Sequence, residues 1–93
     1  MINQLQRDII LDRLSPFQPT QVSVFGSYAR GDNKEGSDLD LLVEFGYPIN
    51  LLELIGLEQE LSKILGVKVD LVTTGAVSPY IKPYIEKDIK KIL

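Results

Sequence analysis

Two aspartates separated by one residue are the first side chains of this sequence that could do chemistry. Asp38 and Asp40 flank Leu39, and in an extended strand this spacing places both carboxylates on the same face. Two negative charges about 4 Å apart repel by about 4 kcal/mol at an effective dielectric constant of about 20, so the pair needs water, a proton or a cation beside it. The chain contains no histidine and no cysteine. A metal ion there would have oxygen ligands only, which favours Mg²⁺ or Mn²⁺.

A glycine and a serine upstream of this pair could hold the phosphates that such a cation binds. Gly26 ends a predicted strand and Ser27 begins a predicted helical turn, so free backbone N–H groups and a hydroxyl would face an anion that glycine allows to come close. Arg30 lies one turn further on the same side and adds a fixed positive charge. Asp70, on the polar face of a later predicted strand, joins the carboxylates if the strands are neighbours.

The elements that must position these residues follow from hydrophobic spacing and from cap residues. The stretch from Asp38 to Phe45 alternates polar and apolar residues, as a strand with one buried face does. We predict an α/β (α+β) fold with a small mixed three-stranded sheet, helices packed mainly on one face, and the other face partly open. The predicted elements are helices over 3–14 and 51–65, the latter capped by Asn50, Glu53 and Gly66, strands over 21–25, 38–45 and 67–73, a helical turn over 27–30, and a C-terminal helix opened by Ser78 and Pro79.

The overall composition limits the classes of protein to which the chain can belong. With 93 residues, of which 44% are hydrophobic and 25% charged, we expect a single globular domain spanning residues 1–93. The net charge of −3 does not favour direct binding of nucleic acid, which usually needs a basic face. No apolar run approaches the roughly 20 residues of a membrane span, and no export signal is present, so we expect no membrane partner and a cytoplasmic location.

Each motif is weak alone, because an Asp-x-Asp pair also occurs on exposed strands and most Gly-Ser turns are only turns. Their combination is specific: Gly26-Ser27, then residues 28–37, then Asp38-Leu39-Asp40 on a strand and Asp70 on another. This pattern resembles the signature of the polymerase-beta-type nucleotidyltransferase superfamily. The segments GSYARG, SDLDLLVEF, VDLVT and SPYIKPYI resemble the minimal nucleotidyltransferase (MNT) family of prokaryotes. Neither a P-loop nor a Rossmann glycine motif is present.

The resemblance implies an activity, a set of roles and a partner. By it, Asp38 and Asp40 hold two divalent ions, most simply Mg²⁺, and Asp70 ligates the catalytic ion and helps to deprotonate the acceptor hydroxyl. Gly26, Ser27 and Arg30 hold the β- and γ-phosphates of ATP. MNT proteins are typically paired with a HEPN-domain toxin, so the resemblance implies an antitoxin that transfers AMP to a tyrosine of that toxin.

Three questions stay open at this level. The chain could instead neutralise a toxin by binding alone, or transfer a nucleotide to a small molecule such as an aminoglycoside. No residue that reads the base is identifiable, so the nucleotide preference is not predicted. The apolar group Tyr80, Ile81, Tyr84 and Ile85 could form a partner surface, but we favour packing of the last helix onto the core.

Overall fold

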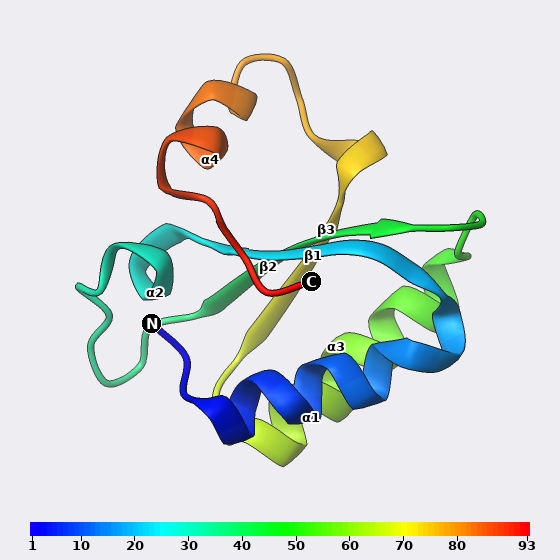
Figure 1. Ribbon diagram of the computed structural model, residues 1–93, viewed down its shortest axis with the longest axis horizontal. Helices are drawn as coiled ribbons and strands as arrows, with labels where there is room; N and C mark the ends of the chain where they lie inside the picture. Colours follow the sequence, from blue (N-terminus) through cyan, green and yellow to red (C-terminus); the bar gives the residue numbers. More distant parts are fainter.

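A mixed sheet of four strands forms the centre of the computed structural model, which describes residues 1–93. The strand order is β3-β2-β1-β4, with β2 parallel to β3 and β1 antiparallel to both of its neighbours. Helices α1 and α3 lie on one side of the sheet and α4 on the other (Figure 1). The elements are α1 (Gln4–Leu14), a 3₁₀ turn (Ser15–Phe17), β1 (Pro19–Phe25), α2 (Gly26–Arg30), β2 (Leu39–Phe45), α3 (Leu51–Leu65), β3 (Val69–Thr73), a 3₁₀ turn (Thr74–Ala76), α4 (Lys82–Asp88) and β4 (Lys90–Lys91).

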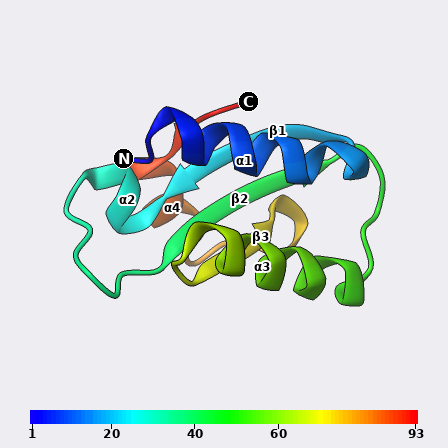
Figure 2. The same ribbon diagram turned by 90° about the horizontal axis from the view of Figure 1, so that it is seen from below.

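The buried core lies between the sheet and the two helices α1 and α3, which run side by side beneath the strands (Figure 2). On β2, Leu39, Leu41 and Val43 are fully buried, whereas the intervening Asp40 and Leu42 are only partly buried. This confirms the predicted alternation, which places the acidic side chains on the face away from the core. None of the helices has the length and apolar composition needed to cross a membrane.

The caps predicted for α3 are present. The Asn50 side chain accepts a hydrogen bond from the Glu53 N–H at 2.8 Å, and the Glu53 carboxylate accepts one from the Asn50 N–H at 3.3 Å. Gly66 ends the helix with φ +71°, a left-handed conformation that glycine adopts without strain. Because these signals are local in sequence, the ends of α3 could be predicted without knowledge of the tertiary structure.

Two predictions about the C-terminal part of the chain are wrong. The sheet has four strands and not three, because Lys90 and Lys91 pair with Val24 and Ser23 on the free edge of β1. So short a strand depends on a partner that is distant in sequence. The last helix begins at Lys82 and not after Ser78, whose hydroxyl accepts from the Tyr80 N–H in a turn.

The apolar group in this region also differs from what we favoured. Tyr80, Ile81 and Tyr84 are 87%, 50% and 75% exposed, and only Ile85 is buried. Helix α4 therefore packs through Ile85 and presents Tyr84 to solvent, while the turn before it exposes Tyr80 and Ile81.

Candidate active site

The pairing of three strands brings the predicted carboxylates together on the open face of the sheet. In the register of the sheet, Asp40 of β2 lies opposite Asp70 of β3 on one side and opposite Phe25 of β1 on the other. Asp38 lies two residues before Asp40 and is half-buried. The expectation that Asp70 comes close to the Asp-x-Asp pair therefore agrees with the geometry.

Gly26 follows Phe25 directly and lies against the carboxylate of Asp40. A Cβ atom at position 26 would collide with Oδ2 of Asp40, and the backbone there has φ +71°. Any L side chain would thus meet both a steric and a conformational penalty at this position. The glycine of the predicted phosphate turn is required by its contact with the carboxylate as well as by the turn.

The electrostatic environment of Asp40 marks it out among the acidic residues. Its pKa is raised from 3.8 to about 6, first by burial, then by the negative charges of Asp70 and Asp38 and by a hydrogen bond to Asp70, while Arg30 opposes the shift. A clustered carboxylate with a strongly perturbed pKa is typical of functional sites. The cluster is short of positive charge, and a cation would relieve the repulsion within it.

Lys68 supplies some of that positive charge, and the sequence analysis did not identify it. Its Nζ lies 3.7 Å from Oδ2 of Asp38 and 4.0 Å from Oδ1 of Asp70. The signal was available, because Lys68 precedes Asp70 by two residues and so shares its face in an extended segment. The ammonium group therefore neutralises part of the charge of Asp38 and Asp70.

The donor set fits a hard divalent ion, since it consists of carboxylate oxygens alone. The side chains are not gathered into a ready-made group of three ligands. Binding of Mg²⁺ or Mn²⁺ would therefore require the side chains of Asp38, Asp40 and Asp70 to converge and Lys68 to move aside. The Lys68 side chain is 70% exposed, so its displacement costs little.

The predicted phosphate-binding side chains differ in whether they already have a hydrogen-bond or ion-pair partner. The Ser27 hydroxyl takes part in none of the side-chain hydrogen bonds, and no side chain caps the start of α2. Arg30 is engaged: its Nε lies 3.1 Å from Oδ2 of Asp32 and its Nη1 lies 3.2 Å from Oδ2 of Asp88, and both carboxylates raise the pKa of Arg30. Arg30 would have to exchange one of these partners to reach a phosphate.

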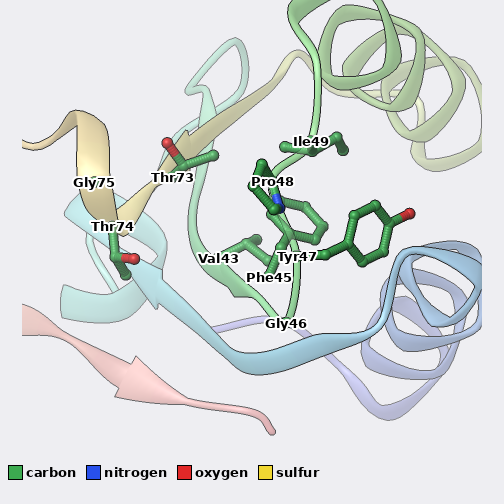
Figure 3. Close-up of a pocket in the computed structure, with 9 residues that line it drawn as sticks. All are labelled: Val43, Phe45, Gly46, Tyr47, Pro48, Ile49, Thr73, Thr74 and Gly75. Carbon is green, nitrogen blue, oxygen red and sulfur yellow. The ribbon is translucent and has the colours of Figure 1, made fainter.

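Two cavities of about 400 Å³ lie near the sheet, and none of the three aspartates lines either of them. The first lies at the far end of β2, between Phe45, Tyr47 and Pro48 on one side and Thr73 to Gly75 on the other (Figure 3). The second lies between the open face of the sheet and α4, and its floor includes Leu42, two residues after Asp40. The second cavity and the carboxylates thus share one face of the sheet.

Sequence comparison places the chain among nucleotide-transferring enzymes. Residues 6–92 match the model of the nucleotidyltransferase domain family. A Methanocaldococcus jannaschii protein named as a candidate protein adenylyltransferase is 47% identical over 74 residues, which cover 78% of this chain and 76% of that protein. The protein adenylyltransferase MntA of Thermococcus cleftensis is 40% identical over 73 residues, covering 78% of this chain and 74% of MntA.

Structural comparison gives the same fold. A chain in the structure of a tri-AMPylated HEPN toxin of Shewanella oneidensis in complex with an MNT antitoxin superposes with a TM-score of 0.80. The superposition covers 99% of this chain and 72% of that one at 22% identity, which by itself establishes the fold alone. The match of residues 6–92 to the family model and the identities of 47% and 40% show that the chain belongs to the nucleotidyltransferase domain family, with protein adenylyltransferases among its relatives.

Proposed function

We propose that this enzyme is a metal-dependent protein adenylyltransferase that moves AMP from ATP to a tyrosine hydroxyl of a HEPN-domain toxin and so acts as its antitoxin. The observation that carries the proposal is that Asp40 of β2 lies beside Asp70 of β3 and that its carboxylate lies against Gly26, the residue directly after β1. We further propose that residues 1–93 act as one domain in the cytoplasm.

Asp38, Asp40 and Asp70 are the residues that would hold divalent cations, two Mg²⁺ or alternatively Mn²⁺. Such ions, when bound, neutralise phosphate charge and make an acceptor hydroxyl more acidic. The raised pKa of Asp40, about 6, is what a carboxylate shows before the charge of its cluster is compensated.

The chain's own residues account for the remaining steps of the transfer. The acceptor oxygen attacks the α-phosphorus, the bond from that phosphorus to the bridging oxygen breaks, and pyrophosphate leaves. Asp70 helps to take the proton of the acceptor hydroxyl, because in a chain without histidine proton removal rests on a carboxylate or on the acidity that a metal ion would give the hydroxyl. Gly26 and Ser27 hold the β- and γ-phosphates by backbone N–H groups and a hydroxyl, with Arg30 released from Asp32 or Asp88 to join them.

The partner is inferred from relatives. MntA of Thermococcus cleftensis bears the name of a protein adenylyltransferase, and the similar Shewanella oneidensis structure contains an AMPylated HEPN toxin. A HEPN toxin is therefore the acceptor that we propose, and tyrosine is the residue that the family resemblance suggests.

The test is transfer of labelled AMP to the HEPN partner in the presence of Mg²⁺. We expect Asp38→Ala and Asp40→Ala to lower transfer by at least about 10²-fold, the smallest effect usual for loss of an acid–base or metal-holding group. Both variants should fold, since these side chains lie on the open face. Asp12→Ala is the control, because Asp12 is 77% exposed on α1 on the other side of the sheet.

The outcomes separate the alternatives. If the toxin is neutralised equally well by Asp38→Ala, the chain acts by binding and not by transfer. If label appears on an added small molecule but not on the HEPN protein, the acceptor is wrong. Unfolding of both variants would show that the carboxylates are structural.

A further inference from the structure

We propose that the cavity between the sheet and α4 binds the nucleoside part of the triphosphate, and that the amide of Gln21 recognises its base. The proposal rests on the proposed function, because it takes the phosphates to lie at the carboxylates. It adds the place where the nucleoside binds and the side chain that reads its base, which neither the sequence motifs nor the relatives specify.

The position of the cavity is the first argument. Leu42 follows Asp40 by two residues on β2, so it lies on the same face about 7 Å further along the strand. Leu42 pairs with Ser23 of β1 and Val72 of β3, and Glu44 pairs with Gln21. The floor of the cavity is therefore the part of the sheet next to the row of Phe25, Asp40 and Asp70. A ribose attached to an α-phosphate at the carboxylates would place its base there.

The character of the walls is the second argument. Four of the lining residues are apolar. Of the charged ones, Lys82 lies with its Nζ 3.9 Å from Oε1 of Glu86, and the carboxylate of Glu44 accepts a hydrogen bond from the Thr20 hydroxyl at 2.9 Å but has no cation beside it. A triphosphate would be repelled by the excess of carboxylate. An uncharged aromatic ring fits such a site, and about 400 Å³ lies within the usual range for small-ligand pockets. The apolar walls are Leu42, Val77, Ile85 and Ile89.

The third argument is the unused amide at the edge of the cavity. Gln21 is half-buried and lines the cavity, yet its side chain makes none of the structure's hydrogen bonds. A half-buried amide without a partner loses part of its solvation, so a ligand that bonds both its donor and its acceptor gains affinity. Adenine offers such an edge, with an amino donor beside a ring-nitrogen acceptor that glutamine can bond in pairs. Guanine presents two acceptors at the same edge and does not match.

The roof of the cavity is fixed to the phosphate turn. Helix α4 contributes Ile85 and Glu86 to the cavity, and Asp88 at the end of the same helix pairs with Arg30 of α2 at 3.2 Å. The predicted phosphate site and the nucleoside cavity are thus connected by one ion pair. A single nucleotide could span both.

The experiment separates the nucleoside from its phosphates. The full chain with Mg²⁺ is titrated calorimetrically with ATP, with GTP and with tripolyphosphate, which carries the phosphates without a base. We expect Leu42→Trp, which fills the cavity, to weaken ATP binding by about 10-fold or more, equivalent to about 1.4 kcal/mol, and to change tripolyphosphate binding less than about 2-fold. Leu52→Trp is the matched control, because Leu52 is 82% exposed on α3.

A second variant tests the role of the amide. We expect Gln21→Leu to reduce the preference for ATP over GTP at unchanged tripolyphosphate affinity, because the amide that distinguishes adenine from guanine is lost. The proposal is overturned if Leu42→Trp leaves the affinity for ATP unchanged, or if it lowers the affinities for ATP and for tripolyphosphate to the same extent. Should Leu42→Trp fail to fold by circular dichroism, Val77→Trp, in the loop that forms another wall, replaces it under the same criteria. A wild-type chain that binds neither ATP nor tripolyphosphate overturns the proposed function itself, whereas one that binds both but ignores the cavity variants overturns only the nucleoside site.

Discussion

At the scale of single residues, Gly26 is the position where the backbone and the site depend on each other most closely. We expect Gly26→Ala to abolish transfer and to destabilise the fold by more than the roughly 1–2 kcal/mol that a left-handed conformation costs an L residue. The reason is that its Cβ would meet Oδ2 of Asp40. Gly36→Ala is the control, since Gly36 has φ +86° and open space around it. Urea denaturation measures the free energy of unfolding of both variants. Equal losses would show that the contact with Asp40 adds nothing to the cost of the left-handed conformation.

Asp40 gives the metal-free protein a defined dependence of stability on pH. Its pKa is about 6 in the folded state and ordinarily 3.8, so between these values the folded chain holds a proton that the unfolded chain releases. The contribution of Asp40 to stability is therefore fully present below about pH 4 and is lost as the pH rises to about 6. The full shift corresponds to about 3 kcal/mol, which partial exposure to solvent reduces to about 1 kcal/mol.

This pH dependence is tested by urea denaturation in EDTA at several pH values, comparing the wild type with Asp40→Asn, whose side chain cannot ionise. We expect the variant to resemble the wild type near pH 4 and to be the more stable protein near pH 7. Asp12→Asn, at a highly exposed position, controls for the loss of one negative charge. Parallel stability curves for wild type and Asp40→Asn would contradict the raised pKa of Asp40.

At the scale of elements, α3 protects the outer edge of β3. The Leu71 N–H donates to Oε2 of Glu58 at 2.7 Å, and the Val69 N–H donates to the Ser62 hydroxyl at 2.8 Å. Glu58 and Ser62 are one helical turn apart, so two side chains of α3 satisfy donors that an edge strand would otherwise leave open to another chain. This keeps β3, and with it Asp70, in place.

Removal of the Glu58 acceptor should therefore weaken β3. We expect Glu58→Ala to cost about 1–3 kcal/mol, the usual penalty for an unsatisfied backbone donor, and to speed hydrogen exchange at the Leu71 amide. Glu58→Gln keeps an acceptor oxygen and should lose much less. Hydrogen-exchange mass spectrometry combined with urea denaturation measures both effects, and unchanged exchange in Glu58→Ala would show that the bond does not protect the strand.

The same elements show which features of the fold local sequence patterns can predict and which they cannot. The alternation of β2 and the caps of α3 are encoded within a few residues, so the polar face with Asp38 and Asp40 could be predicted. The pairing of Asp40 with Asp70 requires two strands that a helix separates, and no local pattern encodes their register. The same reason explains why β4, the edge contact of Glu58 and the cavity beside Leu42 were not predicted. Lys68 is different, because its spacing from Asp70 would have revealed it.

At the scale of the whole molecule, the exposed side chains of α4 and the turn before it offer a surface for the partner. Tyr84 of α4 and Tyr80 and Ile81 of the turn before it are at least half exposed, and α4 lies on the side of the sheet away from α1 and α3 (Figure 1). Exposed tyrosines near an active site are typical anchors of protein interfaces. A toxin held there would bring its hydroxyl to the face of the sheet on which transfer occurs.

This surface can be tested independently of the fold. We expect the double variant Tyr80→Ser, Tyr84→Ser to keep its stability within about 0.5 kcal/mol, as exposed positions do, and to bind the HEPN partner at least about 10-fold more weakly, since interface anchors contribute about 2 kcal/mol or more each. The double variant Leu51→Ser, Leu52→Ser removes a comparable exposed apolar pair at the start of α3 and should bind normally. Calorimetric titration with the partner compares the two. If both double variants bind as the wild type does, the toxin docks elsewhere, and if the tyrosine variant loses stability instead, these side chains belong to the packing of α4.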